Sequence, residues 1–212
     1  MNMPTSSVKK RSYRMSARAD AAAATRERLL AAAWQHFASH PYEDVRLQEI
    51  AADAGVTAQT LYTQFGSKDQ LLTAAYVWFG QQEITKRDTA PAGDIHTAIE
   101  VLFDRYESHG TAVLRMLSQE DRIPAIAQMT DAGRVYHREW ATKTFAPLLR
   151  GSRGASRERR LAAIVVATDL LVWKLLRQDM QLDRNQAEEI VAEMVRSAPP
   201  ADRSTSSGLT AD

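Results

Sequence analysis

The sequence contains no cysteine, and this absence excludes several kinds of chemistry. Disulfides, a nucleophilic thiolate and a zinc site built on cysteine are all ruled out. A chain without cysteine also fits a reducing compartment, so we expect a cytoplasmic protein. No stretch reaches the ~18 uninterrupted apolar residues that a membrane helix needs, because Asp169 interrupts the longest apolar run, residues 161–173. The basic N-terminus has no apolar segment behind it, so we expect neither a secretory signal nor a membrane partner.

The sequence also lacks strand signals. It has no alternating runs of β-branched residues and no Asn-Gly or Asp-Gly turns. Apolar residues recur instead at helical spacing. We therefore predict an all-α fold of about nine helices, over residues 25–39, 47–54, 58–64, 67–87, 94–110, 112–119, 124–149, 156–180 and 184–196.

The common motifs of catalysis and cofactor binding are missing as well. There is no P-loop, no G-x-G-x-x-G, no G-x-S-x-G and no H-E-x-x-H. The chain also has no E-x-x-H pair of the kind that holds metals inside helical bundles. We therefore predict that the protein is not an enzyme and that it has no catalytic residues, no metal site and no cofactor.

The net charge is only +1, but it is unevenly distributed. Residues 1–28 carry seven basic and two acidic residues, a charge of +5, which leaves −4 for the rest of the chain. A basic arm beside a nearly neutral body suits binding to DNA phosphates. A solvated tail would have the same composition. We expect a disordered basic arm over residues 1–22 and a disordered tail over residues 198–212.

The segment AADAGVTAQTLYTQFGSKDQLL, residues 51–72, has the pattern of a helix-turn-helix. Gly55 has no Cβ and so permits a tight turn between two short helices. Ile50, Val56 and Leu61 are spaced to meet in one core. The outward residues of the second helix are mostly Thr and Gln, which can hydrogen-bond to base edges in the major groove. A routine glycine C-cap followed by a polar turn would show the same local pattern.

A longer block, TRERLLAAAWQHFASHPYEDVRLQEIAADAGVTAQTLYTQFGSKDQLLTAAY at residues 25–76, resembles the tetracycline-repressor (TetR) family of bacterial transcriptional regulators. The marks of the resemblance are IAADAGV and TLY, together with Ala32, Phe37, Phe65, Lys68 and Leu71. The resemblance implies a helix-turn-helix DNA-binding domain over residues 23–70. It also implies an effector-binding and dimerisation domain, a helical bundle, over residues 71–197.

The resemblance further implies which side chains contact double-stranded DNA. These are Arg46, Thr57, Ala58, Gln59, Thr60, Tyr62, Thr63 and Lys68. Two positions depart from the family pattern. Arg46 stands where Thr or Ser usually caps the second helix, and Gln64 stands where His or Tyr is usual.

The last two predicted helices carry a wide apolar surface. One chain could bury it in its own core, or two chains could pack it as an intersubunit four-helix bundle. The resemblance favours a homodimer, which would place two recognition helices on a palindromic operator. The candidate interface residues are Leu161, Ile164, Val165, Thr168, Val172, Leu175, Ile190, Val191 and Met194.

Large aromatic and methionine side chains concentrate in the middle helices. Such residues can be ordinary core, or they can line an apolar cavity for a ligand. The candidate pocket residues are Trp78, Phe103, Tyr106, Met116, Tyr136, His137, Trp140, Asp169 and Trp173. His109 is a further candidate, although a lone histidine is often an ordinary hydrogen-bonded residue.

Asp169 raises a separate question. It falls on the helical stripe of Val166 and Trp173, where an unpaired carboxylate would be costly. It therefore pairs with Arg105, Arg115, His137 or a threonine, or it meets a ligand or a partner subunit.

Together these observations predict a homodimeric transcriptional regulator, a repressor, that a small and mostly apolar effector releases from its operator. The alternative is a constitutive DNA-organising or protein-recruiting module that has no effector.

Overall fold

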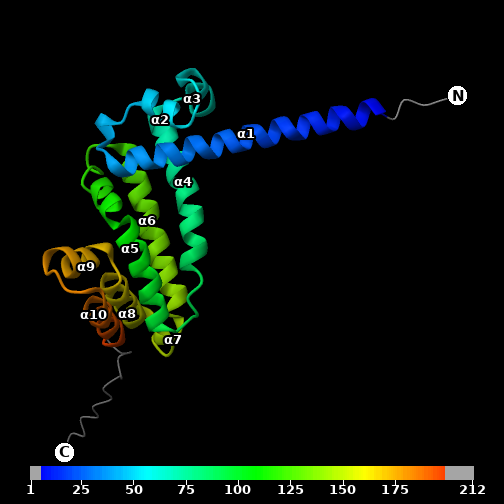
Figure 1. Ribbon diagram of the computed structural model, residues 1–212. Coiled ribbons are helices and arrows are strands. Elements are labelled where there is room, and N and C mark those ends of the chain that lie inside the picture. The colour runs from blue at the N-terminus through cyan, green and yellow to red at the C-terminus, as the bar shows by residue number, and fades with distance from the viewer. Residues whose placement is uncertain (1–5, 199–212) are drawn as a thin grey trace, which may run out of the picture. The chain divides into compact units, whose positions relative to one another are not determined.

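The computed structural model describes the backbone of residues 6–198 and the side chains of residues 19–198 (Figure 1). Within residues 6–198 every regular element is a helix and none is a strand, which confirms the all-α prediction. No helix in this part of the chain is long and apolar enough to cross a membrane. The predicted tail over residues 198–212 lies almost wholly outside the described residues.

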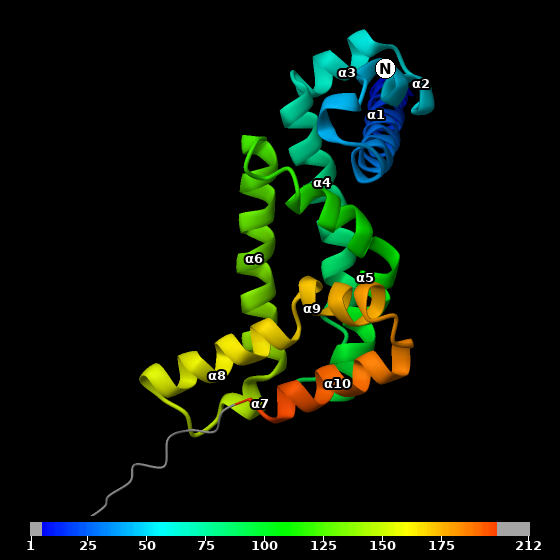
Figure 2. The same cartoon turned by 90° about the vertical axis from the view of Figure 1, so that its left-hand side faces the viewer.

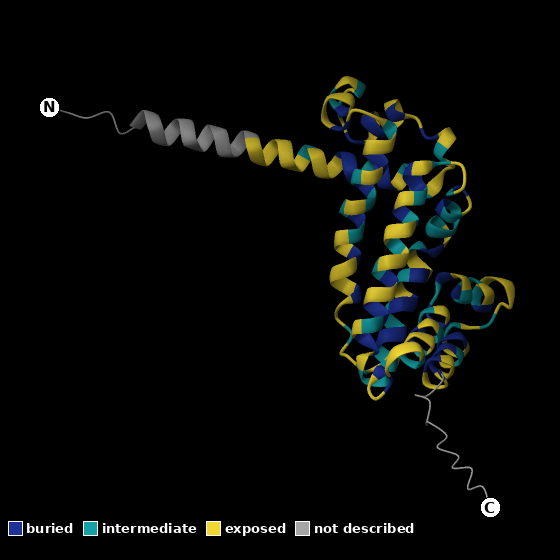
Figure 3. Ribbon diagram, turned by 180° about the vertical axis from the view of Figure 1, so that it is seen from behind, coloured by how far each residue is buried: buried dark blue, intermediate teal, exposed yellow. Residues whose placement is uncertain are grey.

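The first helix is longer than predicted. Helix α1 spans Ser6–Ser39 rather than beginning near residue 25, so residues 6–22 are helical where a disordered arm was predicted. No glycine or proline interrupts this range, and it is rich in alanine, the strongest helix former. The side chains of residues 19–24 are exposed (Figure 3), so this part of the helix rests on helix propensity rather than on packing.

Contacts divide the described chain into two compact units. The first unit comprises the residues up to 82 together with 118–129, and the second comprises 83–117 and 130–198. The first unit therefore extends further than the predicted DNA-binding domain over residues 23–70.

The first unit is built around α1, α2 (Leu47–Asp53), α3 (Ala58–Phe65) and the first part of α4 (Lys68–Arg87). Helix α2 packs on both α1 and α3. Ile50 and Leu61 are fully buried, as the apolar spacing predicted, whereas Val56 is only half-buried, and Leu29 of α1 is fully buried as well. The Trp34 ring stacks on Phe79 of α4 with a centroid distance of 4.0 Å, which ties α1 to α4.

The second unit contains α5 (Ile95–Leu117), most of α6 (Pro124–Thr144), α7 (Ala146–Leu149), α8 (Gly154–Ala167), α9 (Leu170–Lys174) and α10 (Arg184–Arg196). Helix α10 packs on α5 and α8, and α9 packs on α5 (Figure 2). These helices enclose one apolar core that includes Phe103, Trp140, Phe145 and Trp173.

The prediction of two separate helices over residues 94–110 and 112–119 is wrong. The predicted break between residues 110 and 112 does not exist, because α5 runs unbroken through Gly110. A Cβ at Gly110 would lie 2.6 Å from Cζ3 of Trp173, so this glycine allows α9 to approach α5 and does not end a helix.

The predicted single helix over residues 156–180 is also wrong. Helix α8 ends at Ala167, α9 begins at Leu170, and a π-helical turn follows at Leu175–Asp179. The predicted helix over residues 124–149 likewise breaks at Phe145, and a proline follows in the first turn of α7.

Candidate nucleic-acid interface and ligand-binding region

The turn between α2 and α3 depends on a left-handed glycine. Gly55 has φ of +69°, a backbone conformation that costs a residue with a Cβ but not glycine. Next to it, the Val56 amide donates to the Ala51 carbonyl at 2.9 Å and closes the turn. Ala51 is 1% exposed, so its small side chain allows the two helices to cross closely. This geometry is that of a helix-turn-helix.

Thr57 sets the start of α3. Its Oγ1 accepts a hydrogen bond from the Thr60 amide at 3.2 Å, which satisfies one of the free N–H groups at the helix start. Leu61 and Phe65 are buried on the inner face of α3. The register of α3 therefore leaves the opposite face free for other contacts.

The outer face of α3 carries neutral hydrogen-bonding groups. Gln59 and Thr63 are both exposed and lie one turn apart, where Gln59 Nε2 donates to Thr63 Oγ1 at 3.5 Å. Thr63 Oγ1 in turn donates to the Gln59 carbonyl at 2.8 Å. These side chains are solvated in the free protein, so replacing their weak local hydrogen bonds with hydrogen bonds to base edges costs little free energy.

The remaining predicted DNA contacts lie close by. Thr57, Tyr62 and Arg46 are exposed, whereas Ala58 and Thr60 are half-buried. Arg46 occupies the N-cap position of α2 and makes no side-chain capping bond there, so its guanidinium is not used to hold the helix start.

Lys68 is more constrained than the sequence suggested. Its Nζ lies 4.4 Å from the centre of the Tyr42 ring and donates to the Glu43 carbonyl at 3.4 Å. Burial lowers the pKa of Lys68, and the nearby carboxylates of Glu43 and Asp44 oppose that shift. The Tyr42 hydroxyl donates to Asp69. Sequence reasoning missed this anchoring of α4 by the 3-10 turn Tyr42–Asp44, since no local pattern connects the two segments.

The family model of the bacterial regulatory proteins of the tetR family matches residues 29–75, which include this whole helix-turn-helix. Residues 29–75 thus match the DNA-binding segment of the TetR family, as the resemblance predicted. Members of this family are DNA-binding transcription factors and not enzymes. The match therefore supports a transcriptional regulator of the TetR type.

Solved structures resemble the chain well beyond the matched segment. A transcriptional regulator from Rhodococcus sp. Rha1 is 16% identical with a TM-score of 0.63, and the match covers 82% of this chain and 95% of that one. A putative transcriptional regulator from Pseudomonas aeruginosa PAO1 is 18% identical with a TM-score of 0.62, covering 81% and 88%. A TetR transcription regulator from Haloarcula marismortui is 16% identical with a TM-score of 0.57, covering 82% and 95%. No curated protein sequence matches significantly.

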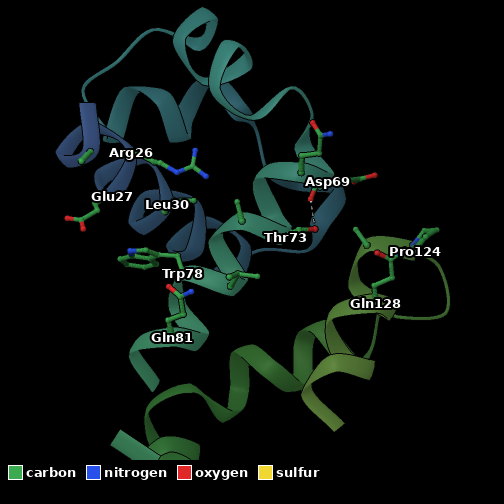
Figure 4. A pocket seen from close by; sticks show the side chains of 14 residues that line it. Arg26, Glu27, Leu30, Asp69, Thr73, Trp78, Gln81, Pro124 and Gln128 are labelled. Carbon is green, nitrogen blue, oxygen red and sulfur yellow. Dashed lines mark hydrogen bonds between the residues drawn. The ribbon is translucent and has the colours of Figure 1, made fainter. Parts of the chain in front are cut away.

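The predicted pocket residues do not all come together. Trp78 belongs to the first unit, where it borders a surface cavity of about 780 Å³ (Figure 4) with Arg26 and Gln128. The other predicted residues lie in the second unit. Among them Phe103, Tyr106, Trp140 and Trp173 are buried in its apolar core, and Met116 is buried as well.

A buried polar network links three of the predicted pocket residues. Arg87 Nη2 donates to His137 Nδ1 at 2.6 Å, and His137 Nε2 contacts Thr168 Oγ1 at 3.1 Å. The Tyr106 hydroxyl donates to the Thr168 carbonyl at 2.9 Å, and Trp140 Nε1 donates to the Arg87 carbonyl at 3.4 Å. Sequence reasoning missed Arg87, because a basic residue in the last turn of a helix is normally an exposed partner of the helix dipole.

Burial, and then the Arg87 charge, lower the pKa of His137 to about 4. At neutral pH the imidazole is therefore uncharged, accepts from Arg87 at Nδ1 and carries its proton on Nε2. That proton lies within reach of two acceptors, Thr168 Oγ1 at 3.1 Å and the Val165 carbonyl at 3.3 Å, and the Thr168 hydroxyl itself donates to the Ile164 carbonyl at 2.8 Å. Arg87 can only donate, so it sets the direction of the hydrogen bonds that run from it through His137.

Asp169 has a role that none of the predicted alternatives included. The helix breaks before it, and its Oδ1 accepts the Leu171 amide at 2.8 Å as the N-cap of α9. The expected stripe with Val166 and Trp173 was wrong because it assumed a continuous helix.

The predicted dimer surface separates into two groups. Leu161, Ile164, Thr168 and Val191 are at most 2% exposed and lie inside the chain's own core, so they cannot reach a partner in this conformation. Leu175 and Met194 are exposed, while Val165, Val172 and Ile190 are half-buried. Val166 and Leu171, both more than half exposed, were not among the predicted residues.

Proposed function

We propose that this TetR-family regulator is a cytoplasmic repressor that binds a palindromic operator as a homodimer, and that a small ligand releases it from the operator. The observation that carries the DNA-reading part is the outer face of α3, which presents neutral side chains behind a left-handed glycine turn. A helix face that contacts only solvent commonly carries charged side chains, whereas neutral hydrogen-bonding side chains of this kind read base edges.

Dimerisation follows from the size of the reading element. Helix α3 has only eight residues and can reach few base pairs. Two copies about 34–36 Å apart would read a palindrome. In support, Val166, Leu171, Leu175 and Met194 leave large apolar side chains exposed on α8 to α10, a feature that monomeric proteins usually avoid when it is extensive.

Ligand release requires an element that connects the two functions. Helix α4 is uninterrupted from Lys68, beside the Tyr42–Asp44 turn, to Arg87, in the buried polar network. A ligand that binds one position of α4 more tightly than another would shift the equilibrium between them, and its differential affinity would limit the effect.

In vitro selection of DNA sites with the purified protein tests the proposal. A recovered palindrome with half-sites one helical turn apart supports a dimeric operator-binding regulator. Enrichment without any sequence preference favours the alternative, a constitutive DNA-organising module. A ligand that saturates the protein and leaves its operator affinity unchanged contradicts the release step.

Two substitutions separate base reading from phosphate binding. Gln59→Ala should alter base preference at one position of each half-site by about 1–3 kcal/mol. Lys68→Ala should weaken binding to all sequences and reduce the slope of log affinity against log salt concentration by about one. Gln178→Ala, an exposed glutamine in the second unit, is the matched control. Equal effects of Gln59→Ala and Lys68→Ala on every sequence would contradict this division.

A further inference from the structure

Arg87 is a buried cation that lacks an acidic partner. It is 4% exposed, and no carboxylate in the described chain lies within ion-pair distance of it. Its guanidinium makes one hydrogen bond to a protein atom, from Nη2 to the neutral His137, and its Nε is buried without a partner. Burial accordingly lowers the pKa of Arg87 to about 10. A buried charge is normally paired, so this one calls for an explanation.

Aromatic rings hold Arg87 in place without neutralising it. Its Cζ lies 3.9 Å from the Trp140 ring centre and 5.3 Å from that of Tyr136. Such contacts stabilise a cation, but an aromatic ring supplies no oxygen or nitrogen acceptor for the N–H groups of the guanidinium. The Tyr136 hydroxyl is also buried without a partner. The cluster therefore contains two unsatisfied polar groups.

Arg87 borders a cavity. This cavity of about 430 Å³ lies in the second unit and is lined by residues of α4 and α5 and by Thr89, with Val101 as its one aliphatic side chain. The volume suits a small organic molecule. The polar lining differs from the mostly apolar site that the sequence suggested.

The charges around the cavity leave a positive excess next to Arg87. Glu83 is already paired, with Lys86 at 3.0 Å and with Arg105 at 3.5 Å. Asp104 pairs with Arg184 at 2.7 Å. Three basic residues and two acidic ones thus line the wall. Burial lowers the pKa of His109, which favours its neutral form, so the excess is a single positive charge.

We propose that this cavity binds a small organic carboxylate and that the Arg87 guanidinium is its recognition group. A carboxylate supplies one negative charge and acceptor oxygens for Arg87 N–H donors, and charge-assisted bonds of this kind are strong when water is excluded. The carboxylate would be the ligand of the release step, so this inference rests on the proposed function for its regulatory meaning.

Calorimetric titration of the full chain tests the site without DNA. The probes are succinate and benzoate, with succinamide and benzamide as neutral controls of the same shape, and inorganic phosphate as a different anion. We expect at least one acid to bind about 10- to 100-fold more tightly than its amide, as one charge-assisted hydrogen bond provides. If neither acid binds more tightly than its amide, the proposal is overturned. This result is expected if water alone satisfies Arg87. Tighter binding of phosphate than of both acids also overturns the proposal.

Variants connect the binding to Arg87. Arg87→Gln should reduce the affinity for the acid to that of the amide. Arg87→Lys keeps a cation over Trp140 if the glutamine variant does not fold, and it should weaken binding at least fivefold because the planar donor fork is lost. Arg138→Lys, the same change at an exposed position of α6, should leave binding unchanged. Unaltered affinity in a folded Arg87→Lys protein would refute the assignment.

The regulatory step has its own readout. If an acid binds through Arg87 and weakens operator binding, both the site and the release step are supported. If it binds through Arg87 and leaves operator affinity unchanged, the site is supported and the release step of the proposed function is wrong.

Discussion

Gly110 lies inside α5 where this helix meets Leu170 and Trp173 of α9, and replacing it with alanine should destabilise the protein. An added Cβ would lie 2.6 Å from Cζ3 and 2.9 Å from Cη2 of Trp173, and 3.1 Å from Cδ1 of Leu170. The indole cannot move aside easily. It is 3% exposed, packs at 6.0 Å from the Tyr106 ring, and donates from Nε1 to Glu107 at 3.2 Å.

Two effects oppose each other in Gly110→Ala. Alanine is favoured over glycine in a helix interior by about 1 kcal/mol. Forcing an extra methyl into a packed core costs about 1–3 kcal/mol, and contacts under 3.0 Å place this site at the upper end. The net result should be a loss of about 2 kcal/mol in the free energy of unfolding, which chemical denaturation followed by circular dichroism would measure.

Gly80 provides the matched control. It is also inside a helix, α4, but no atom lies within 4 Å of its added Cβ, so Gly80→Ala should raise the free energy of unfolding by about 0.5–1 kcal/mol. In a Trp173→Phe background, whose smaller ring relieves the contact, Gly110→Ala should cost less than about 1 kcal/mol. A Gly110→Ala protein as stable as the parent would refute the close packing of α5 against α9.

Three further predictions concern other elements. The pKa of His137 falls from 6.5 to about 4 on folding, so the neutral imidazole contributes about 3 kcal/mol to the free energy of unfolding above pH 6.5, and this contribution is lost as the pH falls through 4. Chemical denaturation at pH 7 and at pH 4 should therefore show a smaller difference in the free energy of unfolding for His137→Gln than for the parent protein. An equal difference in the two proteins would contradict this prediction. Thr57→Ala should lower the free energy of unfolding by about 1 kcal/mol through loss of the α3 cap, whereas Thr57→Ser should not. Leu171→Glu should weaken self-association in sedimentation experiments without unfolding the chain, because Leu171 is 57% exposed, and an unchanged dimer would exclude this surface.

The helix-turn-helix was predictable because its determinants are local. Gly55 must be left-handed, Thr57 is a good cap, and the spacing of Ile50 and Leu61 sets the inner face, all within a dozen residues. The resemblance to the TetR family rests on the same segment, and the family model confirms it. Helix boundaries further along were less predictable. A glycine can end a helix or admit a neighbouring ring, and the choice at Gly110 depends on Trp173, more than sixty residues away.

The sequence by itself determined the all-α class, the left-handed turn and the neutral outer face of α3, because helix propensity, capping and apolar periodicity act over a few residues. Only the tertiary structure decided that Arg87 is buried without a carboxylate and that His137 is neutral beside it. It also decided that Asp169 caps a new helix, and that much of the predicted dimer surface is internal core. Burial and the pairing of charges depend on which distant segments meet, and no spacing along the chain records that.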